Sequence, residues 1–406
     1  MEEWDLRLLE HTAIRMETKV DYKVWQELLL NKAMEESRFP DIKDLIKISK
    51  DADNYLLSAR SRELIDDAIS NSDAVKRAAE KYAKLAEEHN IRMIARDYVY
   101  YPRIWEGISG MPPVLFVKGD IKTLFDLDYY GGASIVGSRV PGRYSLYATG
   151  DFVSKLCAKN IVIVSGMALG IDRKAHEVCL DNGGRTLAVV PGGCDVIYPY
   201  QNRDIYDRIC ETGAVVSEMP PGQEVIKQYF PSRNRLISAL SDVCLIMEAG
   251  EHSGTLHTAS FAAAQGRDVF VLPNSIYADN SIGGLKMLQD GAEVLIDSDT
   301  VYGRIQDKVI FREDDLWFGE DDYVYPEKFD ISVLRDMMRD CPEALNEDDW
   351  KELICDEISE KPKNIDELCV CMGMPFSYLS ALVTGLETEG RIANERGKYV
   401  LTIQGR

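Results

Sequence analysis

The side chains best suited to binding chemistry lie in one stretch, residues 227–235. Two guanidinium groups and an amide stand there at the start of a predicted helix. Guanidinium forks and helix N-termini bind phosphates, and an aromatic ring beside them offers a face on which a base can stack. The stretch therefore predicts contacts with an unpaired nucleic-acid strand. Its candidate residues are Lys227, Phe230, Arg233, Asn234 and Arg235.

The same arginines allow a second interpretation, in which they serve the fold and contact no ligand. Arg233 and Arg235 could form ion pairs with Glu218 and Glu248 in the interior. The sequence leaves both interpretations open.

Small residues follow several predicted strands and leave backbone N–H groups free near helix N-termini. Such turns bind anions readily. A single glycine-rich turn is more often a simple chain reversal, so the evidence lies in their recurrence within one predicted sheet. Glu248, beside the third turn, could instead orient neighbouring arginines. The candidate residues in these turns are Gly137, Ser138, Arg139, Ser165, Gly166, Gly254 and Thr255.

No dinucleotide, ATP, metal or catalytic signature accompanies these turns. Neither GxGxxG nor GxxxxGK[ST] is present, and His252 and His257 stand five residues apart outside an HExxH motif. Cys369 and Cys371 are too isolated for a zinc site. His176 has no serine in a nucleophile elbow, so a packed histidine is the favoured interpretation. We expect no catalytic residue, no metal and no cofactor.

Six short apolar runs, each followed by a turn and a helical pattern, would position these residues. Strands that are apolar on both faces and alternate with helices are typical of a doubly wound parallel sheet. Ligands bind such sheets at the carboxyl edge, where the glycine-rich turns fall. The predicted fold class is therefore α/β, with a Rossmann-like, mostly parallel sheet. The runs are residues 134–136, 161–164, 186–190, 214–216, 243–247 and 269–272.

Changes of pattern divide the chain into four parts. Residues 1–95 carry helix-period patterns with little glycine or proline, and predict an N-terminal helical domain. Residues 96–300 form the predicted Rossmann-like, DNA-binding domain. A charge run within residues 301–345 marks an acidic linker. Residues 346–406 predict three helices and a small hairpin, which together make a winged-helix domain.

The last predicted helix of the winged-helix domain, residues 375–390, contains no lysine or arginine. A helix that reads DNA needs positive charge. We therefore interpret the domain as a protein-interaction element. The apolar stripe of this helix is expected to face the core through Leu379, Leu382, Val383 and Leu386.

The 406-residue chain has a formal net charge of −21, which is unusual for a protein that meets phosphates. The charge is segregated, because residues 131–275 hold 13 basic and 14 acidic side chains whereas residues 301–360 hold 7 and 19. Apolar runs fall short of the ~18 residues of a membrane span, and the first residues lack a basic leader. Nine scattered cysteines without CxxC spacing are typical of reduced, buried thiols. We expect a cytoplasmic protein that contacts no membrane.

Several motifs in a fixed order resemble those of the DNA-processing protein A family, known as DprA or Smf. The resemblance covers about residues 97–297 and is specific, because many ordered motifs agree. They are Gly137-Ser138-Arg139, Ser165 to Asp172, Val190 to Pro199, Ser217 to Gly222, Phe230 to Arg235, and Glu248 to Ala259.

The resemblance implies a domain that binds single-stranded DNA without sequence preference, protects it, and helps to load the RecA recombinase during natural transformation. It also implies a homodimer without established catalysis. It assigns phosphate contacts to Arg139, Lys227, Arg233 and Arg235, and base stacking to Phe230. It assigns close backbone approach to Gly137, Ser138, Ser165, Gly166 and Gly254.

Two positions depart from the family's motifs. Leu169 stands where the family usually has arginine, and Leu285 follows Gly284 where it usually has asparagine. The missing cation predicts a weaker or reshaped anion pocket. The N-terminal helices also lack the Gly-x-Gly hairpin of many members, so that region is expected to serve another purpose.

Two other functions stay open at this point. Wider relatives of this fold are phosphoribohydrolases, which cleave the N-glycosidic bond of nucleotides and resemble proteins with the signature Pro-Gly-Gly-x-Gly-Thr-x-x-Glu. That signature is split here, and Thr258 stands where the catalytic glutamate is expected. The other alternative is a nucleotide sensor that uses the same pocket, with the flanking domains as effector.

Overall fold

The structure of the protein is a computed structural model. It describes residues 3–20, 24, 41–50, 57–96, 100–278, 280–315, 347–372, 376–395 and 398–402. The chain forms two compact units, Met1–Phe318 and Gly319–Arg406.

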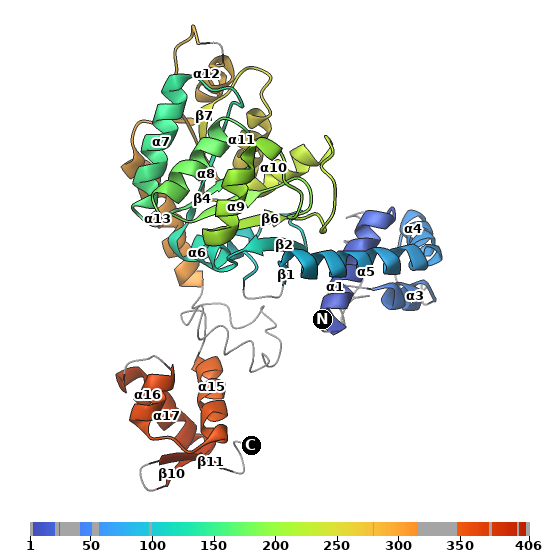
Figure 1. The fold of residues 1–406 in the computed structure, drawn as a ribbon, viewed down its shortest axis with the longest axis vertical. Helices are drawn as coiled ribbons and strands as arrows, with labels where there is room; N and C mark the ends of the chain where they lie inside the picture. The colour runs from blue at the N-terminus through green and yellow to red at the C-terminus, as the bar shows by residue number, and fades with distance from the viewer. Residues whose placement is uncertain are drawn as a thin grey trace. The chain divides into compact units, whose positions relative to one another are not determined.

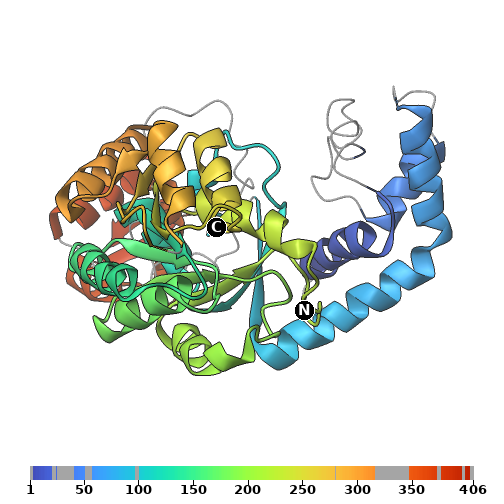
Figure 2. The same ribbon diagram turned by 90° about the horizontal axis from the view of Figure 1, so that it is seen from above.

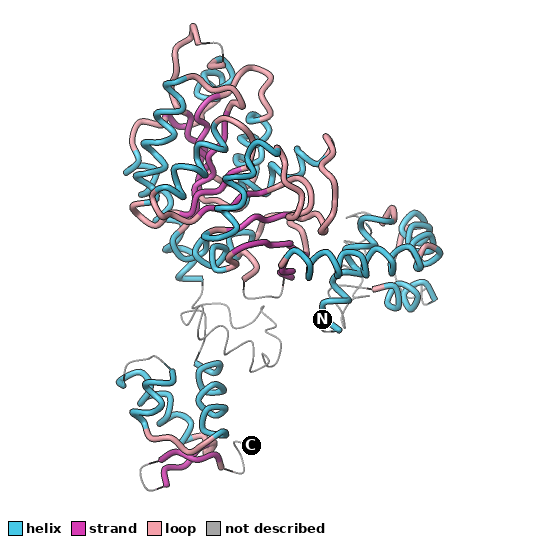
Figure 3. Tube along the Cα trace, viewed as in Figure 1, coloured by secondary structure: helices cyan, strands magenta, loops and turns pink. Residues whose placement is uncertain are grey.

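A nine-stranded sheet forms the centre of the first unit (Figures 1 and 3). The strand order is β1-β2-β6-β5-β4-β3-β7-β8-β9. The strands from β6 to β9 in this order are parallel, whereas β2 is antiparallel to both β1 and β6. The strands are β1 Ile91–Ala95, β2 Val114–Gly119, β3 Gly132–Gly137, β4 Val162–Ser165, β5 Thr186–Val189, β6 Ala214–Ser217, β7 Val243–Glu248, β8 Asp268–Val271 and β9 Glu293–Val294.

All six predicted strand runs are strands of this sheet, β3 to β8. The predicted α/β fold with a mostly parallel sheet is therefore confirmed. The apolar runs predict these strands correctly because both faces of the central strands are covered. Every residue of β7, for example, is buried.

Helices cover both faces of the sheet (Figure 2). Those that follow β3, β4 and β5 lie on one side, and those that follow β6 and β7 lie on the other. The helices of this part are α6 Lys122–Tyr130, α7 Arg143–Cys157, α8 Ile171–Asp181, α9 Arg203–Thr212, α10 Tyr229–Ala239, α11 Thr255–Ala264, α12 Ile282–Gln289 and α13 Ser298–Asp315, with 3-10 turns η1 Arg103–Trp105 and η2 Tyr200–Asn202.

The strand order reverses between β3 and β7, which are hydrogen-bonded neighbours. The chain adds β4, β5 and β6 on one side of β3, and then crosses over to add β7, β8 and β9 on the other. The carboxyl ends of β3 and β7 therefore open onto a topological switch point, which is the usual ligand position of doubly wound sheets.

The N-terminal helices of the described chain are α1 Glu3–Glu17, α3 Ile42–Lys50, α4 Ala59–Ser70 and α5 Ser72–His89. Residues 91–95, which the sequence places in the helical domain, form β1 instead. Asn90 ends α5 with a left-handed backbone, φ 56°, and turns the chain directly into this strand (Figure 2). Tyr82 of α5 shares a hydrophobic cluster with Phe116 of β2. The division of this unit at residue 95 stays a prediction.

The second unit contains three helices and an antiparallel hairpin. They are α15 Glu347–Glu360, α16 Ile365–Met372, α17 Phe376–Thr388, β10 Ile392–Glu395 and β11 Lys398–Leu401. The Lys351 ammonium of α15 pairs with Glu389 at 2.7 Å beyond the end of α17. The predicted core-facing stripe of α17 is confirmed, because all four of its members are buried: Leu379, Leu382, Val383 and Leu386.

The predicted acidic linker, residues 301–345, falls partly within α13, which is helical to Asp315. Residues 316–346 lie outside the described residues. Seven cysteines of the described chain are free thiols. The expectation that the cysteines are all buried is wrong at Cys371, which is exposed on the short helix α16, and at the half-buried Cys210.

The described part of the chain contains no helix that is both long and apolar enough to cross a bilayer. It also contains no group of three or more His, Cys, Asp or Glu side chains that could hold a metal ion.

His176 of α8 is completely buried, as the packed-histidine interpretation predicts. Its Nδ1 lies 2.7 Å from the Thr186 hydroxyl, which donates its own proton to the Ile163 carbonyl at 2.7 Å. Nδ1 therefore carries the ring proton. Burial, and then the nearby Arg233 guanidinium, lower the pKa of His176 to about 3.

We predict that His176 makes the protein acid-sensitive. Because its pKa is about 3 when folded, against an ordinary value of 6.5, the unfolded chain binds the extra proton. The contribution of His176 to the free energy of unfolding is then fully present above pH 6.5. It falls as the pH drops toward 3, by about 2 kcal/mol between pH 6.5 and 5. Urea unfolding at pH 7, 6 and 5 checks this, with His176→Gln expected to show a flatter profile. Parallel profiles for the two proteins would contradict it.

Candidate nucleic-acid interface

The loops after β3 and β7 meet at the switch point. Glu248 ends β7, and its Oε2 accepts hydrogen bonds from the Gly142 N–H at 2.9 Å and from the Ser145 hydroxyl at 2.6 Å. The Asn280 amide donates to the Val140 carbonyl at 3.2 Å. Glu248 thus fixes the loop 138–142 rather than an arginine, so its part in the alternative pairing is not formed.

Phe230 lies at the centre of the predicted binding residues, near the start of α10. The Arg139 guanidinium lies 5.7 Å from the centroid of its ring, and the Arg233 guanidinium lies 5.8 Å from it. Tyr198 meets the same ring edge-on at 5.9 Å. We call these four residues, Arg139, Tyr198, Phe230 and Arg233, the Phe230 cluster.

Arg233 is a buried member of this cluster, with only 5% of its surface exposed. Its Nη1 donates to the carbonyls of Gly166 and Val189, the latter at 2.7 Å, and its Nε donates to the Asn234 side chain at 3.1 Å. Burial, which outweighs the nearby Asp172, lowers the pKa of Arg233 to about 10. This guanidinium joins the ends of β4 and β5.

Asp172 supports the same loop from the start of α8. Its Oδ2 accepts the N–H groups of Gly166 at 3.2 Å and Ala168 at 3.3 Å. Burial raises the pKa of this carboxyl, while Arg233 and the two N–H groups oppose the rise. A Cβ on Gly166 would lie 2.6 Å from the Arg233 Nη1 and 2.8 Å from the Asp172 Oδ2, so only glycine fits between them.

Arg235 forms the internal ion pair that the sequence left open. Its Nη2 contacts the Oε2 of Glu218, which is itself buried. Arg15 of α1 approaches the same oxygen to 4.0 Å. Burial lowers the pKa of Arg15, partly against the attraction of Glu218. One carboxylate therefore joins an N-terminal helix to α10.

Internal contacts occupy three more of the predicted site residues. The Ser165 hydroxyl is fully buried and donates to the Ile135 carbonyl at 2.6 Å. A Cβ on Gly137 would lie 2.6 Å from Ile171, so α8 accounts for that close approach. Ser138 accepts the Val140 N–H at 3.1 Å within its own turn. Their part in binding a strand stays a prediction.

The remaining predicted residues lie on or near the surface. Arg139, Lys227 and Gly254 are exposed, and a Cβ on Gly254 would meet no atom within 4 Å. Asn234 is half-buried, and its amide nitrogen lies 3.5 Å from the Gly254 carbonyl. Thr255 is buried, with its hydroxyl 3.0 Å from that of Ser253. Among the described residues, no ion pair engages Arg139 or Lys227.

The arrangement can bind an anion and an aromatic ring, but it offers no catalytic pair in the described chain. Thr258, which stands in the place of a catalytic glutamate, is buried in α11. Arg139 supplies an exposed positive charge of the kind that binds phosphate, and the half-buried Phe230 supplies an aromatic ring beside it.

Three residues that build the site were not expected from the sequence. Tyr198 packs on Phe230, Asp172 holds the turn after β4, and Asn202 donates to the Met167 carbonyl at 2.7 Å from a fully buried position. An aromatic residue before a proline and an aspartate at a helix start were visible signals for the first two. Asn202 had none.

Known proteins similar to this chain share one family description. Residues 92–306 match the sequence family described as DNA recombination-mediator protein A. Protein Smf of Synechocystis is 32% identical over 323 residues, which cover 77% of this chain and 81% of the relative. DNA processing protein DprA of Bacillus subtilis is 35% identical over 221 residues, which cover 54% of this chain and 73% of the relative.

A solved structure agrees with this match. The X-ray structure of DNA processing protein A from Streptococcus pneumoniae aligns with a TM-score of 0.54 and 28% identity, and covers 74% of this chain and 96% of that chain. The matched family consists of recombination mediators and not of enzymes, in agreement with the prediction that the chain is not an enzyme.

We predict that the two arginines on Phe230 differ in their effect on stability. Arg233→Ala leaves two buried carbonyls and Asp172 without their cation, and should lower the free energy of unfolding by about 3 kcal/mol or more. Arg139→Ala removes an exposed side chain and should change it by less than about 0.5 kcal/mol. Urea unfolding of the full chain measures both. Equal losses would show that Arg233 does not hold the strand ends.

Proposed function

Because the chain belongs to the DNA recombination-mediator protein A family, we propose that it binds single-stranded DNA at the Phe230 cluster and acts on it as a recombination mediator. In this role it protects an incoming strand and loads RecA onto it during natural transformation. The observation that carries the proposal is the half-buried Phe230 ring with the exposed Arg139 beside it, at the carboxyl edge of the sheet.

The burial pattern supports a division of roles among the predicted contacts. Arg139 and Lys227 reach solvent and are proposed to meet phosphates, whereas Arg233 and Arg235 hold the site from within. Local positive charge can attract a strand although the whole chain is acidic, because exposed charges more than ~10 Å apart are screened by salt. The acidic flanks would oppose nonspecific binding of duplex DNA.

We also propose that two copies of the protein associate through the sheet domain. β9 is the last strand in the sheet order, and among the strands that the structure describes none pairs with its outer edge. Val294 and Ile296, at and beyond this edge, are exposed apolar residues. Exposed edges of this kind pair with another chain, which favours a homodimer through the sheet domain.

The second unit is proposed to be a winged-helix domain with a protein partner. Three helices followed by a hairpin fit that architecture. The apolar stripe of α17 is used in its own core, and the helix carries no basic residue that could meet phosphates in a DNA groove. A protein surface, such as that of RecA, is the partner that these features favour.

We expect strand binding to depend on exposed cations. Fluorescence anisotropy with labelled oligo-dT across a salt series should show affinity falling roughly tenfold or more in Arg139→Ala Lys227→Ala. The slope of log affinity against log salt should shrink by about 1.4, because each lost phosphate contact on a single strand removes ~0.7. Lys76→Ala Arg77→Ala removes two exposed cations of α5 as a charge-matched control and should bind normally. Unchanged binding by the first variant would refute the proposed site.

RecA recruitment tests the mediator role separately. Immobilised full-length protein should retain purified RecA, and it should retain more when oligo-dT is present. The Arg139→Ala Lys227→Ala variant should lose only the DNA-dependent increase, because its protein-binding surfaces are unchanged. Retention no greater than on blank resin, with and without DNA, would rule out the partnership.

A further inference from the structure

A band of exposed aromatic and cationic residues runs from the Phe230 cluster onto α7. Tyr144 and Tyr147 are 51% and 80% exposed, and Arg143 is exposed beside them. The apolar residues Phe152 and Leu156 later in the helix are buried in the core. The two tyrosines are therefore not needed for packing α7 onto the sheet.

The band begins where the proposed strand site ends. Arg139 lies in the loop 138–142, and α7 starts directly after that loop. Tyr144 lies in the first turn of the helix, and Tyr147 lies about 4.5 Å further along its axis on the same side. Residues three apart on a helix are neighbours on its surface, so each of the two rings can serve one base.

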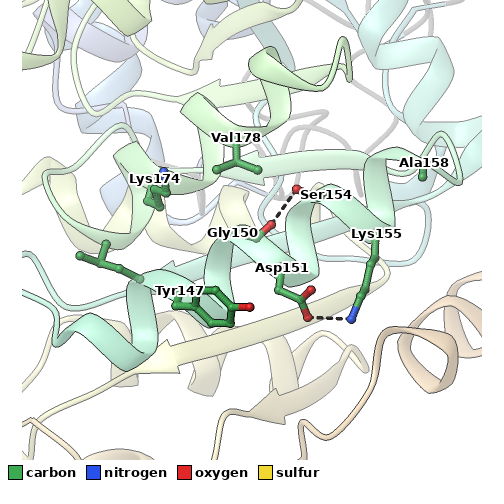
Figure 4. Close-up of a pocket in the computed structure, with 9 residues that line it drawn as sticks. Tyr147, Gly150, Asp151, Ser154, Lys155, Ala158, Lys174 and Val178 are labelled. Atoms are coloured by element: carbon green, nitrogen blue, oxygen red, sulfur yellow. Dashed lines mark hydrogen bonds and ion pairs between the residues drawn. The ribbon is translucent and has the colours of Figure 1, made fainter.

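Tyr147 also forms one wall of a groove of about 500 Å³ between α7 and α8 (Figure 4). Lys174 of α8 lines the same groove. Gly150 forms part of its floor, where a Cβ would lie 3.9 Å from both the Lys174 Cε and a methyl group of Val178.

The cations along this path are available to a ligand. Among the described residues, Lys174 pairs only with Glu177, at 2.9 Å on its own helix. Lys155, at the far end of the groove, pairs with Asp151 at 2.7 Å in the same way (Figure 4). Exposed pairs within one helix are weak, so either ammonium can turn to a phosphate at little cost. Within the described chain, Arg143 forms no ion pair.

We propose that the bound strand continues from the Phe230 cluster along α7, where bases stack on Tyr144 and Tyr147 and phosphates meet Arg143 and Lys174. This inference rests on the proposed function. An unpaired strand fits better than a partner helix, because the path alternates exposed rings with cations and includes the Asp151–Lys155 pair on its rim.

The test compares oligonucleotide lengths. Anisotropy titrations use the full chain with labelled dT6, which is long enough for the Phe230 cluster alone, and with dT20. In Tyr144→Ala Tyr147→Ala, affinity for dT20 should fall roughly tenfold or more, because stacking on each ring contributes strongly. Affinity for dT6 should stay within about twofold of the wild type. Tyr144→Phe Tyr147→Phe keeps both rings and should bind both oligonucleotides normally.

A second variant keeps the test independent of any folding defect. Arg143→Ala Lys174→Ala should reduce the salt dependence for dT20 and leave that for dT6 unchanged. Normal dT20 binding by both the alanine variants would overturn the extended path, and so would an equal loss for dT6 and dT20. If the wild-type protein bound neither oligonucleotide, the proposed function itself would fail instead.

Discussion

The site depends on a buried guanidinium, that of Arg233. Burial of a charge is costly unless its hydrogen bonds are satisfied, and here the carbonyls at the ends of two strands satisfy them. The turn after β4, the end of β5 and the start of α10 must therefore keep fixed positions. Phe230 precedes Arg233 by less than one helical turn, so the same constraint fixes its ring. The exposed Arg139 then completes the cluster from the neighbouring loop.

Buried charges thus organise the interface, and exposed charges are left to bind. Arg235 and Arg15 share the carboxylate of Glu218, which directly follows β6 and links α1 to α10. This contact gives the N-terminal helices a structural role beside the site without any DNA-binding motif of their own. It also explains how a chain with a net charge of −21 can hold a cationic surface. The acids nearest the site neutralise inner arginines and leave Arg139 and Lys227 unpaired within the described chain.

The second unit uses its apolar and charged residues mainly for its own fold. The apolar stripe of α17 packs into the core of the unit, and the buried Lys351 of α15 pairs with Glu389 beyond the end of α17. Among the side chains of α17 that the structure describes, the exposed ones are polar or acidic: Thr384, Glu387 and Thr388. Such a surface repels the phosphate backbone of DNA, and it suits a protein partner that carries positive charge. In the proposed function, the unit would contribute to assembly, while the sheet domain would contact the strand.

The amino-acid sequence by itself determined the strand runs, the helical regions on either side and the residue types of the site. These depend on local periodicity, which burial on both faces of a parallel sheet imposes directly. The sequence missed β1, because five residues after a long helix gain their strand pairing only from β2. It also could not decide whether Arg233 and Arg235 face a ligand or the interior. That choice depends on which carbonyls and acids lie within reach, and strand order alone brings Gly166, Val189 and Glu218 to those arginines from distant parts of the chain.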